Sequence, residues 1–407
     1  MLLTRVFDPV FSFLHRRDNA PLITLSSSAS CIPAEIILAV LELAYYDEDM
    51  QPDVQLLADC AVVCRAWSAP AQSLIFRHVS LRSGSAVSSF CSAVDRSTSR
   101  GRALGDLVVR LHVTLDHNHP DQPSHHAFAH AVCLCPNLYE LDIALYGCAQ
   151  DLAGSRDTAC GLRAVSSLDS ITIGLLREGP RIRSLKLSNW SIDSGRLAFQ
   201  LLAGVWPSLT AVSLRGTPPC FPASEEKALK PSICNLIQVE FNFQRDPGLD
   251  FVSWLLSSSC HSLRCLEFGR EPSPEFLGAV LRQYGPSLES LSIPSCTSPQ
   301  QIIAVQNCER LKEIRLESAS VFPILLKQLP STVEHLAFAI NKDTLLYLLV
   351  NFVKAQPNLK ALTVHFWDGG NEHPQLPNLK IACAYKGVEL LFTRSIQCFR
   401  ATVVSIN

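Results

Sequence analysis

The chain has 407 residues, of which 47% are hydrophobic and 18% are charged, so it can bury a sizeable core. Its formal net charge of −2 provides no basic field for phosphates, which argues against a nucleic-acid partner. The 16 cysteines are too dilute for a disulfide scaffold, and several, such as Cys60 and Cys265, lie in apolar periodic segments. We therefore expect reduced thiols and an intracellular location, cytoplasmic, nuclear or both.

Residues 1–30 lack the pattern of a folded domain. Their apolar side chains are interrupted by Arg5 and Asp8, so the continuous apolar core of a signal peptide is missing. A serine run follows at 26–28, and we expect 1–30 to be a flexible lead-in. The longest apolar run of the chain, 345–353, is too short to cross a bilayer, so no membrane partner is expected.

Residues 31–78 are predicted to form a small helical domain built from two short amphipathic helices. One helical face carries two apolar pairs, Ile36-Ile37 and Val40-Leu41, at the spacing of successive helical turns. Val63, Trp67 and Leu74 make a second apolar stripe. Helices this short are not stable alone, so their apolar faces must pack on each other, on the following domain or on a partner.

This segment resembles the F-box family. The family's Leu-Pro start is Ile32-Pro33 here, the acid is Glu35, and the Val-Cys-Arg-x-Trp ending lies at 63–67. The acidic connector 45–53 is longer than the usual turn. The resemblance implies docking to the Skp adaptor of a cullin-based ubiquitin ligase. The residues expected to face the adaptor or the core are Pro33, Ile36, Ile37, Val40, Leu41, Leu57, Val63 and Trp67. The alternative is an ordinary helical cap.

Beyond residue 78 a short phrase recurs, in which a turn is followed by Leu-x-x-Leu-x-Leu or its aliphatic equivalent. Its first aliphatic residue stands at positions 138, 182, 209, 236, 263, 288, 311, 333 and 359. After the first step, the spacing of about 22–27 residues lies in the range of leucine-rich repeats. The intervals, such as 274–284 and 344–355, carry helical apolar spacing. Each unit is therefore predicted to be a strand followed by a helix, with an earlier strand at 107–115.

Residues 79–384 resemble a divergent leucine-rich-repeat domain, with 385–407 as a C-terminal cap or tail. The resemblance implies an α/β fold in which the small helical F-box precedes a curved solenoid with a parallel sheet on its concave face. The Asn or Cys that usually follows the last strand leucine is mostly missing, so the repeats should be less regular than in a standard horseshoe. An α/β domain with chance periodicity is the alternative.

The strand phase predicts a polar surface on the sheet. If Leu141 and Ile143 point into the core, Glu140 and Asp142 point to the concave face. Carrying this phase along the chain gives a column of mixed charge, which suits a protein or peptide partner. The candidate substrate-binding residues are Asp142, Lys186, Glu240, Glu267, Arg315, His335 and His365. A merely solvated face is the alternative for each of them.

A histidine-rich segment is the best candidate for chemistry. Five histidines lie between 117 and 130, and His126 and His130, four residues apart, could bind zinc together with Cys133. The pair Cys133 and Cys135 lacks the two-residue gap of a zinc knuckle, so we interpret the segment as a polar loop and a repeat helix. Phosphate-binding loops, nucleophile elbows and His-Glu-x-x-His are missing from the sequence. We predict no cofactor, no metal and no catalysis.

Together the two resemblances imply a substrate-recognition subunit of an SCF-type (Skp–cullin–F-box) ubiquitin ligase. The tail of its F-box segment, Leu74-Ile75-Phe76-Arg77, resembles that of fungal F-box proteins. Its expected partners are the Skp adaptor, a cullin bound through it, and a protein substrate that the sequence does not identify. Two alternatives remain: a non-catalytic leucine-rich-repeat scaffold, and metal-dependent chemistry at the histidine segment.

Overall fold

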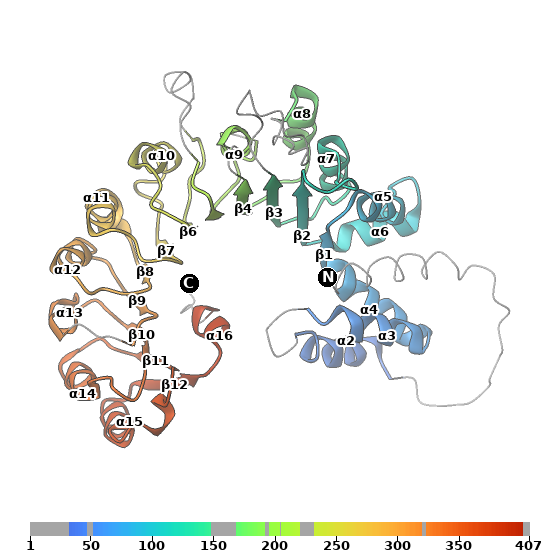
Figure 1. The fold of residues 1–407 in the computed structure, drawn as a ribbon. Coiled ribbons are helices and arrows are strands. Elements are labelled where there is room, and N and C mark those ends of the chain that lie inside the picture. The colour runs from blue at the N-terminus through green and yellow to red at the C-terminus, as the bar shows by residue number, and fades with distance from the viewer. Residues whose placement is uncertain are drawn as a thin grey trace, which may run out of the picture. The chain divides into compact units, whose positions relative to one another are not determined.

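The computed structural model describes residues 32–46, 52–147, 168–191, 195–203, 205–219, 232–319 and 323–401. The chain divides into two compact units, Met1–Leu201 and Leu202–Asn407. In both units, helices alternate along the chain with parallel strands (Figure 1). The predicted flexible lead-in at 1–30 lies outside the described residues.

The first described elements of unit 1 are the helices α2 (Ala34–Leu43), α3 (Val54–Val63) and α4 (Arg65–Arg77). Asp53 caps α3 by accepting a 2.9 Å hydrogen bond from the Leu56 amide. Cys64 is extended (φ −162°, ψ 173°) and separates α3 from α4. The prediction of two helices was therefore wrong, because the segment 63–67 spans a break instead of ending a helix.

The rest of unit 1 is a parallel sheet with helices between its strands. Its strands pair in chain order as β1 (His78–Leu81), β2 (Arg110–Asp116), β3 (Glu140–Gly147) and β4 (Ser184–Ser191). The helices are α5 (Gly84–Ala93), α6 (Ser99–Leu107), α7 (His125–Cys133) and α8 (Ser170–Glu178), and α9 (Gly195–Leu202) follows β4. The core lies between the sheet and these helices, where Leu111, Leu141 and Leu185 are fully buried.

Unit 2 continues the same alternation. Its strands are β5 (Ala211–Gly216), β6 (Gln238–Phe243), β7 (Cys265–Phe268), β8 (Ser290–Ile293), β9 (Glu313–Leu316), β10 (His335–Ile340), β11 (Ala361–Phe366) and β12 (Glu389–Thr393), paired in parallel in chain order. Its helices are α10 (Leu249–Leu255), α11 (Pro274–Tyr284), α12 (Pro299–Gln306), α13 (Pro323–Gln328), α14 (Leu346–Ala355), α15 (Leu376–Lys386) and α16 (Ile396–Ala401). Short 3₁₀ turns lie at Gly285–Ser287 and Gly370–Glu372.

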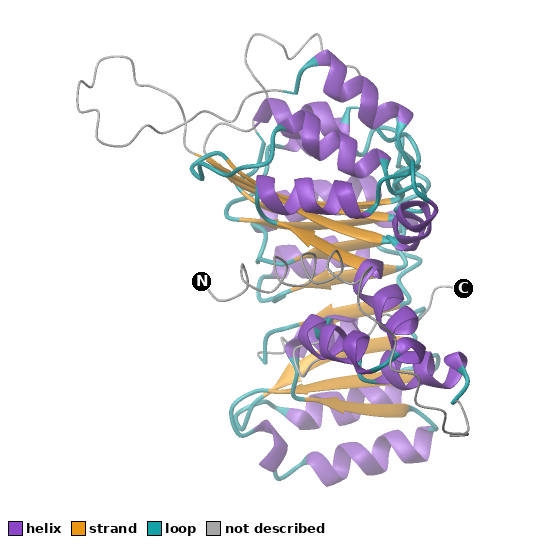
Figure 2. Cartoon of the chain, turned by 90° about the vertical axis from the view of Figure 1, so that its right-hand side faces the viewer, coloured by secondary structure: helices purple, strands orange, loops and turns teal. Residues whose placement is uncertain are grey.

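Helices α10–α15 cover one face of the unit 2 sheet, and α16 lies on the opposite, concave face (Figure 1). A view turned by 90° shows the strands and the helices in separate layers (Figure 2). None of the helices in the described ranges is long and apolar enough to cross a membrane.

The predicted strand–helix repeat is confirmed as an open α/β arrangement of parallel strands. Each strand begins two residues after the first aliphatic residue of its phrase, as Leu138 precedes Glu140 and Leu359 precedes Ala361. These leading aliphatic residues lie where the chain passes from the helical layer into the sheet, and their side chains are buried there. Leu138, for example, is 2% exposed. The edge strands β1 and β12 were not predicted, because neither follows the repeated phrase.

Gly101 lets α6 approach the turn before it. A Cβ at this position would collide with the backbone carbonyl of Asp95, whereas a Cβ at Gly174 in α8 would meet nothing within 4 Å. Gly101→Ala is therefore expected to lower the free energy of unfolding by about 2–3 kcal/mol, because backbone must shift to admit the methyl group. Gly174→Ala is the matched control, with a gain of about 0.5–1 kcal/mol from helix propensity. Urea unfolding measures both, and equal midpoints for the two variants would contradict the expectation.

Candidate functional site

Helix α2 has two apolar faces. Ile37 and Leu41 are each 2% exposed and lie on the buried side of α2, which packs against α4. Ile36, Val40 and Leu43 follow one another at i, i+4 and i+7 and remain 54%, 49% and 89% exposed. A folded domain gains nothing from a second apolar stripe in water, so this face is the first candidate interaction surface.

The predicted adaptor residues divide into three groups. Buried are Ile37, Leu41 and Leu57; exposed are Pro33, Ile36, Val40 and Val63; and Trp67 is partly buried near the start of α4. Further exposed aliphatic side chains lie on α2 and α3 and just before α2. They are Ile32, Leu43, Leu56 and Val62. We call these side chains, together with Ile36, Val40 and Val63, the helical apolar patch.

The three helices are attached to the sheet of unit 1 through α4 and the residues beside it. Arg77 at the end of α4 forms a half-exposed ion pair with Glu42, at 3.4 Å. The Tyr45 ring packs edge-on against His78, the first residue of β1, with ring centroids 5.4 Å apart. Burial, and then the positive charges of Arg110 and Arg77, lower the pKa of His78 to about 4.

Acidification is expected to weaken unit 1 through His78. The pKa of His78 is lower in the folded chain than in the unfolded chain, so the unfolded chain takes up the proton first as the pH falls. The free energy of unfolding is therefore highest above pH 6.5 and decreases as the pH falls toward 4. Between pH 7 and pH 5 this loss should be about 1 kcal/mol, after allowing for partial exposure of the ring. Urea unfolding of the native chain and of His78→Gln at both pH values isolates the effect, since the other histidines are common to both. An identical pH dependence in the two proteins would contradict it.

The sheet face of unit 1 carries paired charges and exposed aromatic rings. His112 Nδ1 lies 3.0 Å from a carboxylate oxygen of Asp142, and Lys186 Nζ donates a 2.9 Å hydrogen bond to Glu140. Asp142 and Lys186 stand side by side in the strand register, and so do Tyr146 and Trp190 four residues further along β3 and β4. Tyr146 and Trp190 are 39% and 42% exposed. Aromatic side chains of this kind are typical anchors at protein interfaces.

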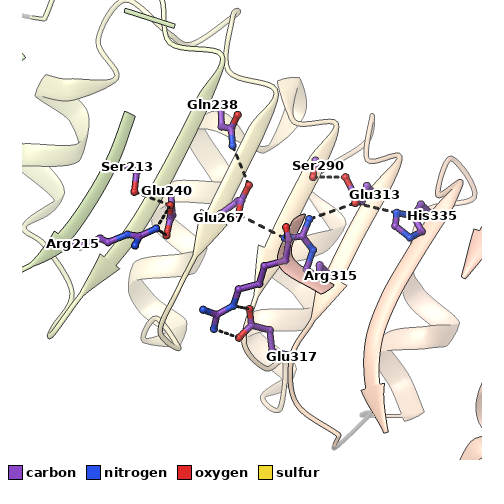
Figure 3. Close-up of polar contacts among 11 residues, drawn as sticks. Ser213, Arg215, Gln238, Glu240, Glu267, Ser290, Glu313, Arg315, Glu317 and His335 are labelled. Atoms are coloured by element: carbon purple, nitrogen blue, oxygen red, sulfur yellow. Dashed lines mark hydrogen bonds and ion pairs between the residues drawn. The ribbon is translucent and has the colours of Figure 1, made fainter. Parts of the chain in front are cut away.

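Unit 2 has a polar column of its own on successive strands. The register places Ser213, Glu240, Glu267, Ser292, Arg315, Ala337 and Thr363 next to one another on successive strands. At its start, Glu240 accepts hydrogen bonds from the Ser213 hydroxyl at 2.7 Å and from Arg215 Nη2 at 3.1 Å (Figure 3). Glu240 is therefore charge-compensated within the sheet.

Arg315 lies at the centre of a buried polar network (Figure 3). Its guanidinium is 3.7 Å from Glu313 and 3.8 Å from Glu267, and its side chain is 2% exposed. His335 Nδ1 donates to Glu313 at 3.0 Å, and the Thr363 hydroxyl lies 2.9 Å from His335 Nε2. Burial raises the pKa of Glu267, and the nearby Arg315 partly offsets this effect.

Helix α16 covers this part of the concave face. Arg315 Nη1 donates a 2.7 Å hydrogen bond to the Arg400 carbonyl, and Arg400 forms two 2.6 Å hydrogen bonds with Glu317. Phe399 is fully buried, and its ring centroid lies 5.4 Å from that of His365. The expectation of an open surface is corrected here: Arg315, His335 and His365 do lie on the concave side, but all three are buried.

Phe399 and Arg400 were not among the residues predicted for this surface. The signal available was the i, i+3 spacing of Ile396 and Phe399 in a segment that was interpreted only as a cap or tail. The other predicted surface residues remain partly accessible: the side chains of Asp142, Lys186, Glu240 and Glu267 are 33%, 38%, 23% and 22% exposed.

The side chains of the histidine segment contact their neighbours in unit 1. His117 is 5% exposed and its ring packs edge-on against His125, with centroids 5.6 Å apart. Cys133 Sγ donates to the Leu175 carbonyl at 3.2 Å, so the thiol is used within the helical layer. Over the part of the chain that the structure describes, no group of three or more His, Cys, Asp or Glu side chains is placed to hold a metal ion.

No protein-family model and no curated protein matches the chain.

Proposed function

We propose that this protein is the substrate-recognition subunit of an SCF-type (Skp–cullin–F-box) E3 ubiquitin ligase. In this proposal α2–α4 bind the Skp adaptor and the repeat sheet binds a protein substrate. The observation that carries it is the second apolar stripe of α2, Ile36, Val40 and Leu43, which is exposed although the helix already has a buried face. The resemblance of residues 32–77 to the F-box supplies the identity of the partner.

The protein would act by holding the substrate near the ligase and would not catalyse the transfer itself. Binding an adaptor through the helices and a substrate through the sheet makes the meeting of substrate and ubiquitin carrier effectively intramolecular. The raised local concentration of substrate then accelerates transfer by the ligase's catalytic partners. The exposed Tyr146 and Trp190 beside paired charges in unit 1 are the residues we expect to contact the substrate there.

Reconstitution with a purified Skp adaptor tests the proposal. The full chain and the adaptor are mixed and passed over a size-exclusion column, and the composition of each fraction is measured. The expected result is a complex with one copy of each protein, stable to dilution into the micromolar range. If the folded full chain elutes separately from the adaptor, the ubiquitin-ligase function is abandoned, and a repeat scaffold with a helical cap takes its place.

A further inference from the structure

The concave face beside α16 has more negative than positive charge of its own. On β5–β9 and the residue that follows β9, the polar network contains four carboxylates, those of Glu240, Glu267, Glu313 and Glu317, against the two guanidiniums of Arg215 and Arg315. Arg400 of α16 provides a third guanidinium. Its hydrogen bonds to Glu317, together with the negative charges of Glu240 and Glu267, raise the pKa of the Arg400 guanidinium above its ordinary value. An arginine is thus the complement of this face.

Helix α16 is held on the face by a small number of side chains. It has six residues, and Phe399 is its one fully buried side chain among those described. The Arg400 side chain is 48% exposed, whereas the side chain of Glu317 beneath it is only 14% exposed. A helix this short is not stable alone, so its position depends on the docking of Phe399 and Arg400. Such a segment can be exchanged for another of the same chemistry.

The surface extends beyond the area that α16 occupies. Trp367 stands at the end of β11, 50% exposed, with its ring 5.5 Å from that of His365 and edge-on to it. His365 therefore contacts Phe399 on one side and Trp367 on another. A longer segment that placed an aromatic side chain at the Phe399 position would be able to pack against Trp367 as well.

We propose that α16 occupies a partner-binding surface on the concave face of β9–β11. The partner is a protein segment that presents an aromatic side chain followed directly by an arginine, and its binding displaces α16. Glu317 and the carbonyl-binding Arg315 recognise the arginine residue, and His365 receives the aromatic ring. The inference rests on the proposed function only in naming the partner as a ligase substrate. The binding itself does not involve the Skp adaptor.

A labelled peptide of Arg394–Ala401, with Cys398→Ser to prevent oxidation, is the probe. Its affinity is measured by fluorescence anisotropy for the native full chain and for the full-length double variant Phe399→Ser/Arg400→Glu, whose own α16 no longer docks. Since an occupied face is available only for the fraction of time that α16 is released, the double variant should bind at least about tenfold more tightly. A peptide with the same two substitutions should not bind. Equal binding by both chains, or equal binding of both peptides, would overturn the proposal.

Reversing the charge on the sheet provides a second test. The Glu317→Arg chain should prefer the probe carrying Arg400→Glu over the unmodified probe, whereas the double variant should show the opposite preference. Circular dichroism checks the fold of each chain. An unchanged preference in Glu317→Arg would overturn the assignment. Adaptor binding, measured separately on the same chains, should be unaffected, so a failure here leaves the ubiquitin-ligase proposal to its own test.

Discussion

Replacing Ile36 and Val40 with aspartate is expected to weaken binding of the Skp adaptor by about 100-fold, because each aliphatic side chain removed from an interface core lowers the affinity by about tenfold. The two side chains are adjacent on the exposed stripe of α2 and are 54% and 49% exposed. Their replacement leaves the buried core of the helices intact, so the melting temperature should change little. Isothermal titration of adaptor into each full-length chain measures the affinity.

Two variants separate this effect from a general loss of structure. Ile171→Asp makes the same kind of substitution once on α8, at a side chain that is 69% exposed, and should bind the adaptor like the native chain. Ile37→Ala, by contrast, truncates a side chain that is 2% exposed and should lower the free energy of unfolding by about 2–4 kcal/mol. If Ile36→Asp/Val40→Asp binds normally while folded, the helical apolar patch is not the adaptor surface.

The repeat architecture was predictable because it depends on short-range patterns. In β3, Leu141 and Ile143 alternate with Glu140 and Asp142, and a two-residue period assigns each set to one face of a sheet. The same phase carried from strand to strand placed Lys186 beside Asp142, as the register shows. Which residues point to the concave side is therefore contained in the local sequence.

Whether those side chains are exposed to solvent was not predictable, because their exposure depends on segments far apart in the chain. Arg315 and the carbonyl of Arg400 are separated by 85 residues, yet their hydrogen bond is part of what buries the column. The break at Cys64 is a second example. No glycine or proline marks it in the sequence, yet Cys64 is extended where α3 ends and α4, which packs against it, begins. The division of α2 into a buried and an exposed stripe likewise needs the neighbouring helices.

The Arg315 network is expected to dominate the stability of unit 2. Arg315→Met should lower the free energy of unfolding by about 3–5 kcal/mol, because it leaves the Glu313 carboxylate buried without its cationic partner. The Glu313 side chain is 3% exposed, so water cannot replace the guanidinium. Methionine preserves most of the length of the replaced side chain, which limits the contribution of a cavity. Urea unfolding with linear extrapolation measures the change.

The size of this effect should depend on burial and not on the removal of an arginine as such. Arg215→Met is the matched control on the same face, where the guanidinium is 43% exposed beside Glu240, and it should cost no more than about 1 kcal/mol. Arg315→Met/Glu313→Gln removes the orphaned charge and should recover a large part of the stability that Arg315→Met alone removes. Equal decreases in Arg315→Met and Arg215→Met would contradict a desolvated network. In that case the burial of Arg315 beneath α16 would contribute little to holding the sheet together.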